Sequence, residues 1–98
     1  TLFRRALRER ALQATELSMA SHILLTARGE APYVGIPVFL SRAFRHGSIV
    51  VRTDRGIGGP ADLAGRRIGL PEYQQTAALW LRGILREQHG VDTRAIAW

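Results

Sequence analysis

The sequence predicts an α/β fold, and its second half supplies the main evidence. A short apolar run at residues 67–70 precedes an amphipathic segment at residues 74–89, and a new apolar run begins at Ile96. A strand, a helix and a returning strand in this order form a parallel β-α-β unit. Upstream, residues 34–40 and 47–53 are rich in β-branched side chains, which favours further strands.

The first half of the chain predicts two short helices with a strand between them. Apolar side chains recur at helical spacing among arginines at Leu2, Phe3, Ala6, Leu7, Ala11 and Ala14. The basic face of this helix is most simply solvated, because no recognition motif or interleaved aromatics support a nucleic-acid-binding arm. Residues 15–20 alternate as a short strand does. Ser21 then caps a helix over residues 22–28, which Gly29 ends.

Proline and glycine mark the boundaries of the later elements. Pro37 places the run at residues 34–40 at a sheet edge or irregularity. The glycine-rich residues 56–60 form a turn and no phosphate loop, because lysine is absent and Pro60 lacks an N–H. Residues 60–63 form a single helical turn. In the long helix the predicted inward stripe is Ala77, Trp80, Leu81, Ile84 and Leu85, and Gly90 stops the helix.

The composition excludes several kinds of chemistry. All 14 basic residues are arginine, and with 8 acidic residues the net charge is +6. Without lysine there is no Schiff-base nucleophile, and without cysteine there is no disulfide, thiolate metal site or cysteine nucleophile. No apolar run approaches the roughly 18 residues of a membrane span. Because the chain starts without Met in a predicted helix and stops in a predicted strand, we expect residues 1–98 to be part of a longer protein.

Residues 41–46 form the first candidate site. Arg42 and Arg45 stand three apart beside His46, a set that suits a dianionic ligand and a proton donor near neutral pH. The alternative interpretation is an ordinary polar surface loop.

Two strand-to-helix junctions are the other candidates. At residues 70–76, free helix amides would attract an anion; alternatively, Glu72 only complements the helix dipole and Thr76 faces solvent. At residues 18–22, Ser21 as an ordinary cap is the favoured interpretation. His22 and His46 give only a weak metal signal, so we expect no metal.

Several strings resemble the 4,5-dihydroxyphthalate decarboxylase family. They are residues 16–21, 36–39, 41–46, 51–57 and 70–78, of which Ser41-Arg42-Ala43-Phe44-Arg45-His46 and Pro71-Glu72-Tyr73-Gln74 are the more specific. Residues 60–69 are similar to a broader pattern of type 2 periplasmic-binding-protein folds, here with arginine in both usual lysine places. The resemblance implies a two-lobed fold in which residues 1–98 form a partial first α/β lobe, a mixed sheet flanked by helices. The rest of that lobe and the second lobe would lie outside this chain.

The same resemblance implies a carboxy-lyase that converts 4,5-dihydroxyphthalate to protocatechuate and CO2, with no cofactor. Arg42 or Arg45 would bind the carboxylate that stays, and His46 or Glu72 would protonate the ring carbon. Ser18, Tyr73, Gln74 and Thr76 would bind ring hydroxyls or a carboxylate. The expected partner is a small aromatic carboxylate, with no nucleic acid and no membrane span, and a homo-oligomer is compatible with the sequence.

A second hypothesis is a substrate-binding component of an ABC-type uptake system for a small organic anion. Fold alone does not separate the two functions. The enzyme is expected in the cytoplasm, whereas the binding component would be periplasmic and would carry an export signal upstream of Thr1. A third hypothesis concerns this segment alone, which would be inactive and associate through exposed lobe surface.

Overall fold

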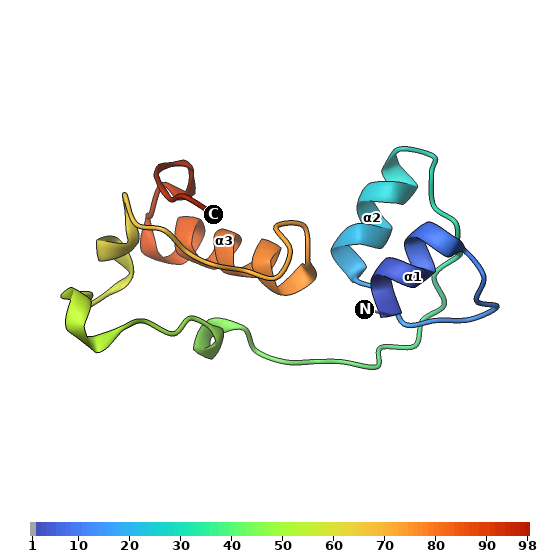
Figure 1. Cartoon of the computed structure of the whole chain (residues 1–98), viewed down its shortest axis with the longest axis horizontal. Coiled ribbons are helices and arrows are strands. Elements are labelled where there is room, and N and C mark those ends of the chain that lie inside the picture. The colour runs from blue at the N-terminus through green and yellow to red at the C-terminus, as the bar shows by residue number, and fades with distance from the viewer. Residues whose placement is uncertain (1) are drawn as a thin grey trace. The chain divides into compact units, whose positions relative to one another are not determined.

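The computed structural model describes residues 2–98, which form two compact units, one up to Ala43 and one from Phe44 onward (Figure 1). Unit 1 contains the helices α1, Leu2–Glu9, and α2, Met19–Ala27. Unit 2 contains the helix α3, Thr76–His89. It also contains four short 3-10 helices: η1 at His46–Ser48, η2 at Thr53–Arg55, η3 at Pro60–Leu63 and η4 at Thr93–Ala95.

The predicted α/β class is wrong: the structure is not a partial type 2 periplasmic-binding-protein-like lobe with a mixed sheet flanked by helices. No strand forms anywhere in residues 2–98. One isolated parallel bridge pairs Arg67 with Ala97, with the Ile68 N–H donating to the Ala97 carbonyl at 2.8 Å. The Ala97 N–H also donates to the Arg66 carbonyl at 2.9 Å, and the residues before Ile96 wind into η4.

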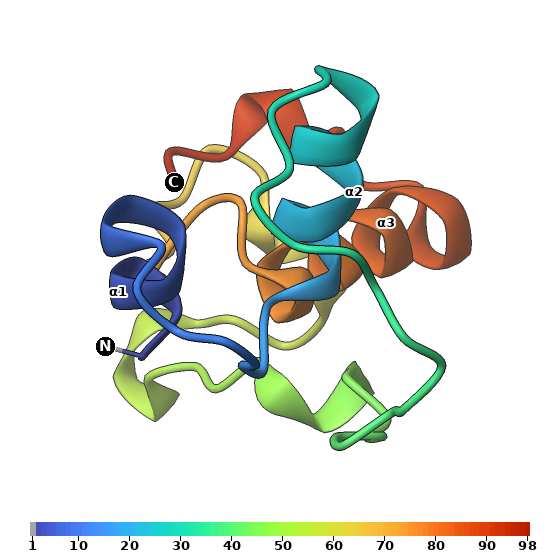
Figure 2. The same ribbon diagram turned by 90° about the vertical axis from the view of Figure 1, so that its right-hand side faces the viewer.

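The predicted strands at residues 34–40 and 47–53 are also absent. The first is an irregular segment of unit 1, drawn in green in Figures 1 and 2, and the second is irregular between η1 and η2. Most of their apolar side chains stay in solvent, with Val34 and Val50 each 91% exposed, whereas Ile49 is partly buried against the core of unit 2. β propensity chiefly measures packing on a pleated surface between neighbouring strands, and such neighbours are missing among the described residues.

In unit 1, helix α1 ends earlier and helix α2 begins earlier than the sequence predicts. Helix α1 ends at Glu9 because Arg10 adopts a left-handed backbone, φ 51°, so Ala11 and Ala14 lie outside it. No strand forms at residues 15–20, and α2 begins at Met19 with Ser18, instead of Ser21, at its N-cap. The extended Ser18 backbone offers its carbonyl to the His22 N–H at 2.9 Å, while Ser21 is buried within the first turn.

Helix α3 is confirmed and organises unit 2. Gly90 stops it in a left-handed conformation, φ 64°, and the Val91 N–H then donates to the Leu85 carbonyl at 3.0 Å. Leu85, 1% exposed, is the most buried residue of a small core completed by Leu63, Val91 and Ile96. Trp80 was predicted to face inward but is 61% exposed. The buried face instead runs through Ala78, Ile84 and Leu85, to one side of Trp80.

No helix in the described part of the chain combines the length and the apolar character needed to cross a membrane.

Candidate functional site

The predicted site residues are divided between the two units. Ser18 and Arg42 belong to unit 1, and Arg45, His46, Glu72, Tyr73, Gln74 and Thr76 belong to unit 2. Within unit 1, Ser18 is buried at the start of α2, and the exposed Arg42 guanidinium lies 5.3 Å from the Phe39 ring centroid. The His22 ring lies against Gly35, where an added Cβ would come within 3.0 Å of Nε2.

In unit 2, His46 lies at the edge of an open groove beside the C-terminal half of α3. Its Nε2 is 3.0 Å from Oε1 of Gln88. The groove has a volume of about 240 Å³. Its walls are mostly apolar, and its lining includes His46, Ile49, Val51, Ile57, Leu63, Leu81, Ile84, Leu85 and His89. Apolar walls with a few polar groups at the edge are typical of sites for small aromatic ligands.

Arg45 precedes His46 at the start of η1 and is half-buried. Its backbone carbonyl accepts from the Ser48 N–H at 3.0 Å, which fixes the local turn. Neither Arg45 nor Arg42 forms an ion pair with a carboxylate of the described chain. Both guanidinium groups are therefore open to a carboxylate from outside the chain.

The other predicted residues form the turn that leads into α3. The Glu72 carbonyl accepts from the Gln75 N–H at 3.2 Å, and Gln75 occupies the N-cap. Gln74 is exposed on the turn, and Thr76 is the first residue of the helix. The segment therefore lies at a helix N-terminus, as predicted, although no strand precedes it.

Sequence reasoning missed Arg82, which holds this turn against α3. Its Nη1 donates to the Tyr73 carbonyl at 2.6 Å, and its guanidinium lies 3.7 Å from the Tyr73 ring centroid. Trp98 meets the same ring edge-on, with centroids 6.3 Å apart. No local pattern signals this contact, because it joins residues nine positions apart across a turn.

Within unit 2, the predicted residues lie at opposite ends of α3. His46 bonds to Gln88 near the C-terminal end, whereas Glu72 precedes the first residue, Thr76. From Thr76 to Gln88 the helix rises roughly 18 Å. The structure therefore does not bring the two candidate acids, His46 and Glu72, to one place.

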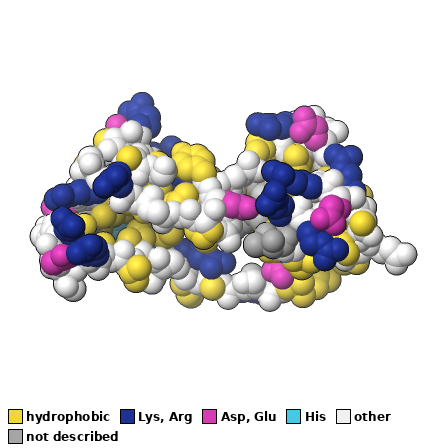
Figure 3. Space-filling model, viewed as in Figure 1, with side chains coloured by type: hydrophobic (Ala, Val, Ile, Leu, Met, Phe, Trp, Pro, Cys, Tyr) yellow, Lys and Arg dark blue, Asp and Glu magenta, His cyan; other side chains and the backbone are white. Residues whose placement is uncertain are grey.

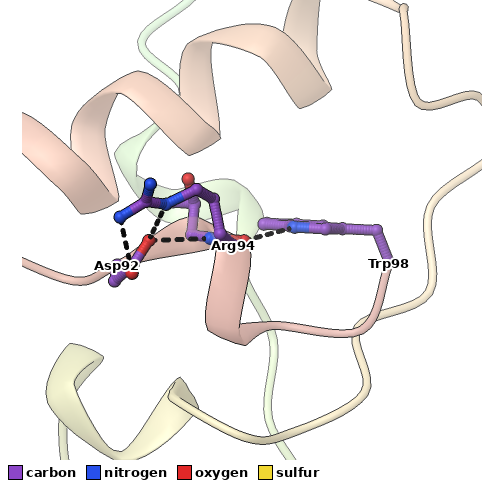
Figure 4. Close-up of polar contacts among 4 residues, drawn as sticks. Asp92, Arg94 and Trp98 are labelled. Carbon is purple, nitrogen blue, oxygen red and sulfur yellow. Dashed lines mark hydrogen bonds and ion pairs between the residues drawn. The ribbon is translucent and has the colours of Figure 1, made fainter.

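Elsewhere in the chain, several arginines form ion pairs with carboxylates that lie within a few residues of them in the sequence. Asp92 accepts from the Arg94 guanidinium at 2.9 Å and from the Arg94 N–H at 3.0 Å (Figure 4). The first of these bonds is the main reason why the pKa of Asp92 lies below its usual value. Arg52 likewise lowers the pKa of Asp54. Figure 3 shows arginines spread among acidic and apolar side chains over the visible face of each unit.

Metal and phosphate sites find little support in the described residues. Nowhere in residues 2–98 do three or more His, Asp or Glu side chains gather as metal ligands. The Gly58 and Gly59 amides donate to the Asp62 carboxylate at 2.9 and 3.0 Å. The chain's own carboxylate therefore occupies the amides that a phosphate would need.

Comparison with known proteins shows two related sequences. The chain is 53% identical over 97 residues to 4,5-dihydroxyphthalate decarboxylase of Comamonas testosteroni. It is 50% identical over 97 residues to the protein of the same name from Pseudomonas putida. Each match covers 99% of this chain but only 29% and 38% of the respective relative. No protein-family model matches the chain, and no solved structure matches it significantly.

Proposed function

We propose that the chain belongs to the 4,5-dihydroxyphthalate decarboxylase family over the part that it spans and contributes to a carboxy-lyase acting on an aromatic dicarboxylate. The substrate is 4,5-dihydroxyphthalate and the products are protocatechuate and CO2. The observation that carries the proposal is the 53% identity over essentially the whole chain to a protein of that name.

The reaction needs a proton at one ring carbon and no external oxidant or reductant. An acid protonates the carbon that bears the leaving carboxylate, and the hydroxyl para to it donates electron density. The bond to the carboxylate then breaks, its electron pair restores the aromatic ring, and CO2 leaves. The protein must therefore bind the remaining carboxylate, hold the ring and supply one proton.

The groove beside the C-terminal half of α3 suits these three tasks better than the turn before α3. Its apolar walls can hold the ring, and His46 at its edge can supply the proton. Arg45, next to His46 and without an ion-pair partner among the described residues, is the cation we assign to the carboxylate that stays. Ser18, Arg42, Glu72, Tyr73, Gln74 and Thr76 stay predictions, to be tested by the same assay.

Turnover is measured in a chimera, because the chain spans only 29% of the Comamonas testosteroni relative. The chain replaces the 97 matching residues of that protein, and CO2 and protocatechuate are quantified. We expect His46→Ala to lower kcat on the order of 10²–10⁴-fold, the contribution of a positioned general acid, with little change in KM. Glu72→Gln, at the other end of α3, should keep kcat close to that of the unmodified chimera.

The possible outcomes separate the hypotheses. Loss of turnover in Glu72→Gln but not in His46→Ala would move the acid to the turn before α3. Full turnover in both variants would remove both candidates. A folded chimera that binds the dicarboxylate tightly without turnover would favour the uptake component, which is also the hypothesis that predicts export instead of a cytoplasmic enzyme.

A further inference from the structure

The contact between His46 and Gln88 lies at the edge of the groove, and the proposed function assigns it no role. The two residues lie 42 positions apart, and this side-chain contact joins η1 to the last turn of α3. Gln88 Oε1 is an acceptor, so a hydrogen bond at this 3.0 Å contact requires a His46 ring with its hydrogen on Nε2. In the neutral ring of that form, Nδ1 is the nitrogen without a hydrogen.

We propose that Gln88 is the positioning residue for His46, fixing the ring so that Nδ1 delivers the proton to the substrate. This inference rests on the proposed function, because it assigns the transferable proton of the same acid to one atom. In this scheme Gln88 itself touches neither the aromatic ring nor the carboxylate of the substrate.

The surroundings of His46 leave Gln88 as the group that can orient it. Of the residues that line the groove, His46 and His89 are the titratable ones, and the others are apolar or glycine. His46 starts a three-residue 3-10 turn, which by itself leaves the side chain free to rotate. A hydrogen bond from a regular α-helix removes that freedom, and positioning of this kind raises kcat more than it changes KM.

The geometry can be tested on the 98-residue chain without any activity, by NMR titration of His46. In Gln88→Glu a carboxylate replaces the neutral amide beside Nε2 and stabilises the charged imidazole. The His46 titration midpoint should therefore rise, by on the order of one pH unit. The matched control is Gln75→Glu, the same change at the opposite end of α3, beyond the roughly 8 Å over which salt screens charges. It should leave the midpoint in place.

The role is tested in the chimera. Gln88→Met removes the acceptor, and we expect kcat to fall on the order of tenfold with KM little changed. In Gln88→Glu, His46 stays protonated to higher pH, so turnover should persist to higher pH by the same shift as in the titration. A merely structural role for Gln88 would not move the pH profile and the titration together.

Each result supports or overturns the proposal. Equal His46 midpoints in Gln88→Glu and Gln75→Glu would show that the two side chains are not in contact. A raised midpoint with an unchanged kcat in Gln88→Met would show contact without a positioning role. If the unmodified chimera lacks turnover, the proposed function fails. In that case two measurements on the 98-residue chain decide whether Gln88 fixes the orientation of the His46 imidazole. One is the His46 titration, and the other is the tautomer of neutral His46, which its nitrogen chemical shifts report in the wild type and in Gln88→Met.

Discussion

Two glycines of α3 should respond to the same substitution with opposite signs. Gly83 lies inside the helix and Gly90 ends it at φ 64°. A Cβ built at either position meets no atom within 4 Å, so neither substitution causes a clash. The outcome therefore depends on backbone conformation alone.

The magnitudes follow from that difference. Gly83→Ala should stabilise unit 2 by about 0.8–1.0 kcal/mol, the helix-propensity difference between the two residues. Gly90→Ala should destabilise it by about 1–2 kcal/mol, the cost of a left-handed conformation for a residue with a Cβ. For a domain of this size about 1 kcal/mol shifts Tm by roughly 4–8 °C, so the two variants should differ on the order of 10 °C.

Tryptophan fluorescence during thermal unfolding is the suitable assay. The chain has two tryptophans, Trp80 and Trp98, and both lie in unit 2, so the signal reports this unit selectively. The reasoning is refuted if Gly83→Ala lowers Tm as Gly90→Ala does, because then Gly83 would not lie in the interior of α3, where the structure places it.

The other predictions concern the core and the charges of unit 2. Leu85→Ala should destabilise the unit by about 2–4 kcal/mol, because Leu85 is 1% exposed. Leu79 lies on the same helix but is 50% exposed, so Leu79→Ala should cost less than about 1 kcal/mol. Urea unfolding followed by fluorescence compares the two variants. The ion pair with Arg94 lowers the pKa of folded Asp92 below its usual value of 3.8, so its stabilising effect is complete above that value and is lost as pH falls through the folded pKa. Unfolding of the wild type and of Asp92→Asn should therefore converge on acidification; parallel pH profiles would contradict the assignment.

Local signals in the sequence predict the helical part of unit 2 well. The apolar spacing indicates where α3 starts, and Gly90 indicates where it ends. Each of these signals comes from residues that are close together in the sequence. The strands fail because a strand is a property of a pair of segments, and composition does not show whether the partner is present. Val34 and Val50 have the expected side chains for a sheet, yet the described chain offers them no neighbouring strand.

The site shows the same limit in another form. The strings at residues 41–46 and 70–76 can be recognised from the sequence, but the placement of His46 and Glu72 at the two ends of α3 cannot. His46 meets Gln88 across 42 positions, and Tyr73 meets Arg82 on the following helix. Contacts of this kind depend on how the chain folds back, and no spacing rule reveals them.

The separation of His46 and Glu72 along α3 constrains the proposed chemistry. Helix α3 is regular from Thr76 to His89, so the roughly 18 Å between Thr76 and Gln88 is fixed by the helix rise. A single benzene ring with two carboxylates is much shorter than this, and it cannot contact His46 and Glu72 together. In the proposed reaction the substrate therefore contacts at most one end of α3. The apolar groove favours the His46 end for the substrate.

At the Glu72 end, the Arg82 contacts with Tyr73 and the packing of Trp98 already account for the turn as a structural start of the helix. Glu72→Gln keeps the backbone carbonyl that accepts from the Gln75 N–H, so it should change turnover little.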